Sequence, residues 1–165
     1  MAYLKHVHNR KDYLPLLLLA DENEDIIMEY INEGEMYVIQ YQQNNIGVCL
    51  FTFPEANMVE IKNIALKEGE QGKGIGKAVI GEAFQLYKQK GYARMIVGTA
   101  NSSLANLSFY QKAGFRFERI RKDFFLSYPH PIFENGIQAL DMVVFSKDLH
   151  EGDGKNEKET VQIHK

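Results

Sequence analysis

A glycine-rich segment between a strand pattern and a strongly amphipathic helix pattern places the tightest constraint on how this chain can fold. The segment reads Gln71-Gly72-Lys73-Gly74-Ile75-Gly76-Lys77. Apolar side chains fall on one helical stripe over residues 75–90, and residues 58–66 are rich in strand-forming side chains. Glycines let backbone N–H groups approach an anion, and the first turn of a helix offers unpaired donors and a positive dipole end. The segment therefore predicts a phosphate or pyrophosphate site at a strand-to-helix junction.

The spacing of the glycines separates the known phosphate-binding motifs. A Walker A loop needs G-x-x-x-x-G-K-[ST], but Gln71 replaces its first glycine and Ala78 lacks the hydroxyl that would hold magnesium. The dinucleotide fingerprint G-x-G-x-x-G fails too, because its third glycine would fall on Lys77 or Val79. The pattern that remains is [QR]-x-x-G-x-[GA], met by Gln71, Gly74 and Gly76. The alternative interpretation is a glycine-rich turn that binds nothing.

Length and composition predict one domain that folds by itself. The chain has 165 residues; we expect the domain at 1–149 and a flexible, charged tail at 150–165. A net charge of −3 leaves no basic excess for a nucleic-acid backbone or an anionic membrane. The single cysteine, Cys49, excludes an internal disulfide and a four-thiolate zinc site, and we expect no metal. Without a signal peptide or a membrane-spanning apolar run, the expected location is the cytoplasm.

The periodicity of the apolar side chains predicts a mixed α/β chain in the order β-α-α-β-β-β-α-β-α-β-β. We expect strands at 3–8, 36–41, 46–53, 58–66, 92–99, 115–126 and 137–146, and helices at 12–20, 24–32, 75–90 and from Ser102 or Ser103 to 113. Turns are expected at Asn44-Asn45 and at 54–57. Antiparallel strands before a single βαβ crossover indicate an α+β sheet and exclude a doubly wound nucleotide fold.

The apolar pattern changes phase within the strand expected at residues 58–66. Val59 and Ile61 put the apolar face on odd positions, whereas Ile64 and Leu66 put it on even positions. Because side chains alternate along a strand, this shift predicts a β-bulge near residues 62–64. A bulge leaves backbone N–H groups unpaired, and such a donor can hold a carbonyl oxygen or an oxyanion. The alternative is a strand that is buried on both faces.

With these features, the chain resembles the GNAT superfamily of acyl-CoA-dependent N-acyltransferases over about residues 36–145. The resemblance rests on the glycine-rich segment, on residues 59–66 before it, and on residues 106–115, which read NLSFYQKAGF. It implies a mostly antiparallel central sheet of about seven strands flanked by helices. It also implies acetyl-CoA as co-substrate and an amine, from a small molecule or a peptide, as acceptor. A homodimer fits as well, because many relatives pair through their sheets.

Two side chains are candidates for acid–base catalysis. Asn106 and Tyr110 stand four positions apart and so share a helix face. By resemblance, Tyr110 would protonate the departing CoA thiolate, and its ordinary pKa near 10 keeps it protonated at neutral pH. In several relatives a glutamate at the position of Glu60 acts through water as the general base that frees a lone pair on the incoming ammonium. The alternatives are a core tyrosine and a solvent-side glutamate.

The resemblance also implies which residues hold acetyl-CoA. Backbone groups around Ile64 would grip the acetyl carbonyl, and Ala65 and Leu66 would follow the pantetheine arm. The pyrophosphate would lie on Gln71, Gly72, Lys73, Gly74, Ile75, Gly76 and Lys77. Many relatives carry an asparagine seven residues before the tyrosine, where this chain has Ser103. Asn101 and Asn106 are therefore both candidates for the cofactor contact.

The function expected is transfer of an acetyl group from acetyl-CoA to an amine by direct attack. A non-catalytic acyl-CoA sensor on the same scaffold and a hydroxyl acceptor are the alternatives. Residues 127–136, SYPHPIFENG, are too long for a tight hairpin and would border the acceptor pocket, with His130 and Glu134 available. Other acids that would face the acceptor are Asp21, Glu22 and Asp123, and their convergence with Glu60 would favour a cationic acceptor. Cys49 is interpreted as a buried structural thiol.

Overall fold

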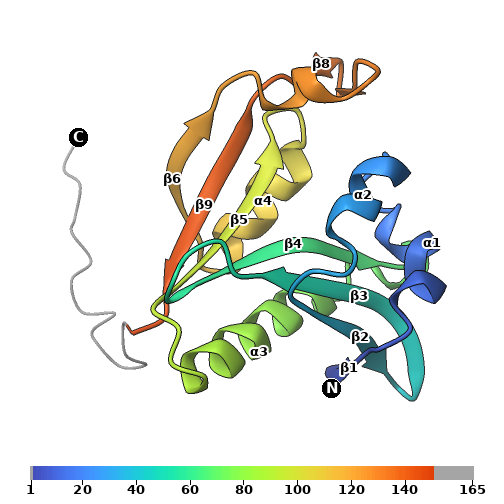
Figure 1. Ribbon diagram of the computed structural model, residues 1–165, viewed down its shortest axis with the longest axis vertical. Helices are drawn as coiled ribbons and strands as arrows, with labels where there is room; N and C mark the ends of the chain where they lie inside the picture. Colours follow the sequence, from blue (N-terminus) through green and yellow to red (C-terminus); the bar gives the residue numbers. More distant parts are fainter. Residues whose placement is uncertain (1, 151–165) are drawn as a thin grey trace.

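A seven-stranded sheet forms the centre of the computed structural model, which describes residues 2–150 (Figure 1). The strands lie in the order β1-β2-β3-β4-β5-β9-β6. Their bounds are β1 Ala2–His6, β2 Glu35–Tyr41, β3 Asn44–Thr52, β4 Met58–Leu66, β5 Arg94–Ala100, β6 Arg116–Arg121 and β9 Met142–Asp148. Only β4 and β5 pair in parallel, and every other neighbouring pair in this sheet is antiparallel. The expected α+β fold with a mostly antiparallel sheet is confirmed.

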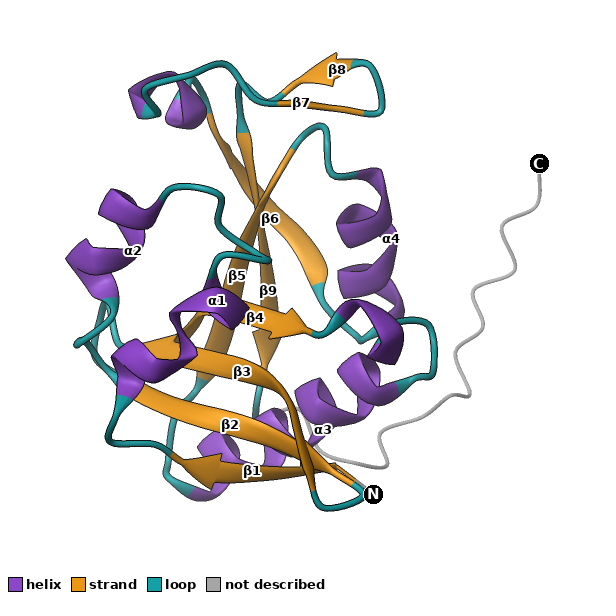
Figure 2. Cartoon of the chain, turned by 90° about the vertical axis from the view of Figure 1, so that its right-hand side faces the viewer, coloured by secondary structure: helices purple, strands orange, loops and turns teal. Residues whose placement is uncertain are grey.

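Helices cover both faces of the sheet. They are α1 Leu14–Leu17, α2 Glu24–Tyr30, α3 Ile75–Gln89 and α4 Leu104–Lys112. Figure 2 shows α3 and α4 on the opposite side of the sheet from α1 and α2. Alternate side chains of β2 point to opposite faces of the sheet. Tyr37 and Ile39 pack in the core with α3 and α4, whereas Met36 and Val38 pack in the core with α1 and α2. No helix among the described residues has the length and apolar character needed to cross a membrane.

Helix α3 begins and ends close to where the sequence predicts. Its buried residues, on one stripe, are Ile75, Val79, Ile80, Ala83 and Tyr87. Gly74, at the N-cap, has φ +78°, and Gly91, just beyond the last turn, has φ +90°. Both values lie in the left-handed region that glycine enters without strain, so the glycines set the two ends of the helix.

Two predictions in the N-terminal half are wrong. The helix expected at 12–20 is a 3₁₀ turn, Arg10–Tyr13, followed by the short α1, because Pro15 stands at the start of α1 and cannot lie inside a longer helix. The turn expected at Asn44-Asn45 lies instead at Gln42 and Gln43, which have φ +50° and +66°. Asn44 already pairs with Tyr41 as the first residue of β3, so the strand register leaves only two residues for the turn.

The last two strands are also shorter than expected. The predicted strand 115–126 ends at Arg121, and Asp123 reverses the chain with φ +62°. The predicted strand 137–146 becomes the two-residue β8 (Ile137–Gln138), paired with β7 (Phe133–Glu134), and then β9. Side-chain hydrogen bonds, described below, hold the segment between β8 and β9 in place of a strand ladder. The tail expected to be flexible lies, from residue 151, outside the described residues.

Candidate active site

Strand β4 contains the bulge that the phase shift predicts. Leu50 of β3 pairs with Asn63, but its neighbour Phe51 pairs with Ile61. Lys62 therefore stands between two paired residues without a partner on β3, which defines a one-residue bulge. The residue that bulges is exposed, whereas its neighbours are buried.

The bulge moves the apolar side chains of β4 from odd to even positions. Val59 and Ile61 before it, and Ile64 and Leu66 after it, all pack with the core under α3 and α4. Ala65 points to the other face and packs in the core with α1 and α2. The change of phase therefore reflects a true shift of register rather than a strand that is uniformly buried on both faces.

Beyond the bulge, β4 and β5 separate. Their parallel ladder runs from Met58 paired with Arg94 to Ile61 paired with Val97. Within residues 2–150, no ladder joins residues 62–66 of β4 to β5, and residues 98–100 of β5 pair with β9 alone. The sheet is thus split at its centre, on the side of β4 that faces away from β3.

Backbone groups of Ile64 and Leu66 point into this split. The Lys67 N–H donates to the Ile46 carbonyl at 2.8 Å, which marks a hydrogen-bonded pair between β3 and β4. Because bonded and non-bonded pairs alternate along an antiparallel ladder, the N–H and C=O groups of Ile64 and Leu66 face away from β3. The Gln71 side chain confirms the direction, since its Nε2 donates to the Leu66 carbonyl at 3.3 Å. Ala65, one position out of phase, has its backbone groups on the β3 side.

The glycine-rich segment forms an open cradle at the end of the split. Gly72 and Gly74 both have φ +78°, and a Cβ on either would meet no heavy atom within 4 Å. The first hydrogen bond of α3 runs from the Ala78 N–H to the Gly74 carbonyl at 3.1 Å. The N–H groups of the three residues between them have no intrahelical acceptor, so they are available to an anion. Lys73 forms an exposed ion pair with Glu70 at 3.3 Å.

Three elements meet at the N-terminus of α3. A Cβ on Gly76 would lie 3.1 Å from the ring of Phe109 in α4 and 3.7 Å from the side chain of Leu66 in β4. The glycine therefore allows a close approach that a larger residue would prevent. This contact puts the anion cradle, the end of β4 and the middle of α4 side by side.

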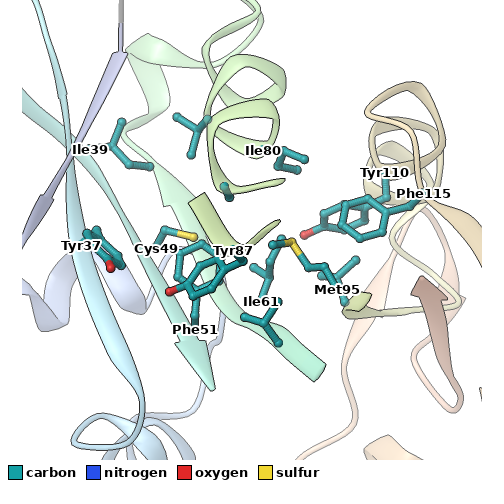
Figure 3. Packing of buried hydrophobic residues seen from close by; sticks show 14 of the residues in the cluster. Tyr37, Ile39, Cys49, Phe51, Ile61, Ile80, Tyr87, Met95, Tyr110 and Phe115 are labelled. Atoms are coloured by element: carbon teal, nitrogen blue, oxygen red, sulfur yellow. The ribbon is translucent and has the colours of Figure 1, made fainter. Parts of the chain in front are cut away.

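Tyr110 is buried next to this meeting point. Its ring contacts those of Phe109, Phe115 and Phe145, and its residue exposure is 5%. Figure 3 shows the hydroxyl directed into the cluster, on the side of Met95. Burial raises the pKa of Tyr110 above its usual value, so the hydroxyl stays protonated throughout the physiological range. Among residues 2–150 no protein group accepts a hydrogen bond from it.

Glu60 lies on the opposite face of the sheet, where no helix of the described residues covers β5, β9 and β6 (Figure 1). It borders an open depression of about 340 Å³, which also reaches Ile96 and Val144. We call this feature the open depression. The one ion-pair partner of Glu60 among the described residues is Lys62, at 4.0 Å, the limit of such a contact.

Asn63, beside the bulge, connects β4 to the two N-terminal helices, a role that was not predicted from the sequence. Its buried amide donates to the Leu17 carbonyl and to the Tyr30 hydroxyl, both at 3.0 Å. Tyr30 in turn donates to Asp21 at 3.2 Å, and Tyr128 donates to the same carboxylate at 3.3 Å. The sequence feature that could have indicated this role is an amide side chain within an apolar strand, at the point where the apolar pattern of β4 changes phase.

The two candidate asparagines have different surroundings. Asn101 uses its whole side chain inside the protein: its Oδ1 accepts from the N–H groups of Leu140 and Asp141, at 2.9 and 3.0 Å, and its Nδ2 donates to the Gln138 carbonyl at 3.1 Å. Asn106 is exposed on α4 and makes one weak contact, from its Nδ2 to Thr99 Oγ1 at 3.3 Å. Asn106 is therefore the residue with free hydrogen-bonding capacity.

The loop at residues 127–141 is fastened to the turn between β5 and α4. Ser103 occupies the N-cap of α4, but its hydroxyl donates to Glu134 at 2.8 Å rather than capping the helix. The Asn135 amide donates to the Ser102 carbonyl at 3.0 Å. Glu134 is therefore bonded to Ser103, Asp21 to two tyrosines and Glu60 to Lys62, so each of these three acids already has a partner among the described residues. Across residues 2–150 no cluster of three His, Cys, Asp or Glu side chains could hold a metal ion.

Cys49 is buried in β3, and burial raises the pKa of its thiol. A thiol that resists ionisation is a poor nucleophile, which supports the interpretation of Cys49 as part of the core.

Comparison with known proteins gives a consistent result. Residues 6–115 match the profile of the Acetyltransferase (GNAT) family. The N-acetyltransferase YvbK of Bacillus subtilis is 46% identical over 135 residues, which cover 81% of this chain and 87% of that protein. A GNAT family acetyltransferase from Elizabethkingia anophelis, solved with acetyl-CoA bound, has a TM-score of 0.82 and 37% identity over 89% of this chain and 97% of its own. A Bacillus subtilis acetyltransferase in complex with CoA has a TM-score of 0.80 and 42% identity over the same shares of the two chains.

Proposed function

The chain belongs to the GNAT family of acetyl-CoA-dependent N-acetyltransferases, and we propose that it moves the acetyl group to an amine by direct attack, without an acyl-enzyme. The observation that carries this proposal is the split between β4 and β5. It leaves the backbone of Ile64 and Leu66 unpaired on one side, and the anion cradle of α3 stands at its end. A molecule with a thioester, an extended amide-containing arm and a pyrophosphate fits that sequence of sites.

The contacts to acetyl-CoA follow the split from one end to the other. The Ile64 N–H would hold the thioester carbonyl, and the Leu66 backbone would pair with the pantetheine arm, as a strand pairs with its neighbour. For that pairing the Gln71 amide must leave the Leu66 carbonyl, which is easy because their contact is long and exposed. The pyrophosphate would lie on the free N–H groups of the cradle. Asn106 is the better candidate for the further cofactor contact, because Asn101 is occupied.

The chemical step needs a base, an oxyanion donor and an acid. The amine nitrogen forms a bond to the acetyl carbon, and the C–S bond breaks. Glu60, directly or through water, takes one proton from the ammonium before attack, and the second proton that the nitrogen loses after attack returns through water to restore the Tyr110 hydroxyl. The Ile64 N–H would stabilise the negative charge on the carbonyl oxygen, and Tyr110 would deliver a proton to the thiolate sulfur. The raised pKa makes Tyr110 a weaker acid than a free tyrosine. The thiolate would also be a stronger base away from water, because desolvation disfavours its charge, and this offsets the weaker acid.

Calorimetric titration with acetyl-CoA, CoA and ATP tests the cofactor site first. We expect acetyl-CoA and CoA to bind and ATP not to bind. A following assay of thiol release with a panel of amines and alcohols tests turnover. Binding without turnover of either class would indicate a sensor rather than an enzyme, and turnover with alcohols alone would replace the nitrogen acceptor by oxygen. Failure of both CoA species to bind would remove the proposal altogether.

A further inference from the structure

The open depression next to Glu60 has an apolar floor. Its floor side chains come from three neighbouring strands: Met58 of β4, Ile96 of β5, and Val144 and Met142 of β9. The Met142 side chain lies over Gly98, where a Cβ would collide with it, so the floor has no gap at the glycine. A volume of about 340 Å³ suits a small molecule, and methionine side chains can adapt to an apolar group of varied shape.

Opposite charges stand on opposite sides of this floor. Glu60 borders the depression from β4, and Arg119 borders it from β6, with β5 and β9 between them. Glu55 lies on the side of Glu60, and Glu118 on β6 is neutralised by its ion pair with Arg94. At the ordinary spacing of strands, about 14 Å of sheet separates the two backbones. Arg119 pairs with Val144, so its position on β6 lies directly beside a residue of the floor.

Among residues 2–150, Arg119 is the arginine of the depression whose charge has no protein partner. Arg94 forms an ion pair with Glu118 at 2.6 Å, and the guanidinium of Arg121 lies over the Phe124 ring, 4.7 Å from its centre. Within residues 2–150, Arg119 makes no ion pair, ring contact or side-chain hydrogen bond. A guanidinium beside an apolar floor recognises a carboxylate well, because its N–H donors match the two oxygens of that group.

We propose that the acceptor is a small amphoteric amine, with its ammonium group against Glu60, its apolar spacer on the floor and its carboxylate against Arg119. This inference rests on the proposed function, because it names the substrate of the same site. The long contact between Glu60 and Lys62 can give way to the ammonium of a substrate. A diamine would place a cation against Arg119, and a plain alkyl amine would leave Arg119 unpaired. Both are therefore poorer acceptors than an amino acid of similar length.

Matched pairs of amines test this assignment. We suggest 4-aminobutyrate, 6-aminohexanoate and 3-(aminomethyl)benzoate, each compared with its own carboxamide in an assay of CoA release. The carboxylate is the group that changes within a pair, so the ratio of the two kcat/KM values isolates its contribution. We expect the acid to be preferred by about tenfold or more in at least one pair, the size of one charge-assisted hydrogen bond.

Variants of β6 connect the preference to one residue. Arg119→Gln should reduce the acid-to-amide ratio about tenfold, whereas Arg116→Gln, on the same exposed strand but outside the depression, should keep the wild-type ratio. Arg119→Glu should shift the preference toward 1,4-diaminobutane. Both positions are exposed, so the variants should fold, and circular dichroism checks this.

Three results would overturn the acceptor assignment. They are amides accepted as well as acids in every pair, an unchanged ratio in Arg119→Gln, or no acid acetylated at all by a protein that binds acetyl-CoA. None of these three results would contradict the proposed transfer of an acetyl group from acetyl-CoA to an amine. Loss of acetyl-CoA binding in the wild-type protein, by contrast, would remove the proposed function and the acceptor assignment together, so the two failures are distinguishable.

Discussion

The Asn63 amide donates a hydrogen bond to the Tyr30 hydroxyl at 3.0 Å, which ties the strand beside the β4 bulge to helix α2. The same amide reaches the Leu17 carbonyl in α1, and Tyr30 passes the connection on to Asp21. Tyr128, from the loop at 127–141, completes it by donating to Asp21 across 107 residues of sequence. The bulge, the α1–α2 connection and the loop at residues 127–141 are therefore parts of one hydrogen-bonded network.

Removing the Tyr30 hydroxyl should weaken the fold and the reaction together. In Tyr30→Phe, Asn63 loses one acceptor and Asp21 loses one donor in a part-buried site. We expect a loss of about 1–2 kcal/mol in the free energy of unfolding, measured by urea denaturation. We also expect a lower kcat at unchanged affinity for acetyl-CoA. The Ile64 N–H, proposed to stabilise the oxyanion, follows Asn63 in β4 and would be held less firmly in position. Tyr3→Phe, at an exposed position, is the matched control. A Tyr30→Phe protein as stable as that control would show that the network contributes nothing.

Tyr110→Phe should separate catalysis from binding. Phenylalanine fills the same space among the aromatic rings, and the hydroxyl that it removes has no acceptor within the described chain. The stability should therefore change little, while kcat falls about a hundredfold or more if the hydroxyl protonates the thiolate. Steady-state kinetics with acetyl-CoA as the varied substrate, combined with calorimetry, measures both effects. Wild-type turnover in this variant would remove Tyr110 from the mechanism.

Local chemistry predicted the β4 bulge and the glycine-rich segment well. The phase change in β4 and the glycines around Gly74 are each determined by a few neighbouring residues, and the structure places the bulge and the start of α3 where the sequence predicts them. The order of the main strands and helices along the chain also followed from periodicity, because alternation marks a strand and a 3.6-residue repeat marks a helix.

The contacts of the loop at residues 127–141 could not be predicted in the same way. The interaction of Ser103 with Glu134 joins residues 31 positions apart, and that of Tyr128 with Asp21 joins residues 107 apart. Such pairs depend on how the loops meet in space, and neither residue type nor sequence spacing predicts them. The strand expected to continue to residue 126 failed for the same reason, since the backbone N–H groups of Asp123 and Phe125 donate to the Asp141 carboxylate and the Leu140 carbonyl instead of extending a strand ladder.

Substitutions of two glycines in and near α3 should have opposite effects on stability. Gly74 has φ +78°, so Gly74→Ala should lower the free energy of unfolding by about 1 kcal/mol even though the Cβ meets nothing. Gly81 lies inside α3 with an ordinary φ and equally open surroundings, so Gly81→Ala should raise it by about 0.5–1 kcal/mol. Urea denaturation of the two variants measures the contrast. Equal effects of the same sign would contradict the assigned backbone geometry.

Gly74→Glu should abolish acetyl-CoA binding, because it puts bulk and negative charge into the cradle proposed for the pyrophosphate. Calorimetry with acetyl-CoA measures this directly, and Gly81→Glu, about two turns further along α3 from the cradle, controls for added charge on this helix. If Gly74→Glu binds acetyl-CoA as tightly as the wild type, the pyrophosphate lies elsewhere.

Glu60→Gln should make the reaction depend more strongly on external pH. The amide cannot take a proton, so turnover must draw on the fraction of amine that is already deprotonated in solution. The ratio of wild-type to variant kcat/KM should be about a hundredfold near neutral pH and should shrink as the pH approaches the pKa of the amine. A pH profile with a single amine substrate tests this. A ratio that stays constant across the profile would indicate that Glu60 binds the acceptor but does not accept its proton.

Alkaline pH should destabilise the fold in two stages. Burial raises the pKa of Cys49 above its ordinary 9.0 and the pKa of Tyr110 above its ordinary 10.0. A group whose pKa is raised by folding leaves stability unchanged below its unfolded pKa and reduces it above that value, because only the unfolded chain then loses the proton. Each buried group should therefore cost about 1.4 kcal/mol per pH unit above its unfolded pKa.

Urea denaturation at several values between about pH 8 and 11 measures these stages. The free energy of unfolding should begin to fall near the ordinary pKa of the thiol. It should fall more steeply once the tyrosines whose pKa folding raises, the buried Tyr30, Tyr87 and Tyr110 and the half-buried Tyr128, also ionise in the unfolded chain. Cys49→Ala leaves a small cavity, so it should be less stable at the lower end, yet its stability should stay level until the tyrosines begin to titrate. Tyr110→Phe should keep the first stage and show a shallower second one. If the wild type and Cys49→Ala lose stability in parallel from the lower end upward, the buried thiol is not the group that sets the first stage.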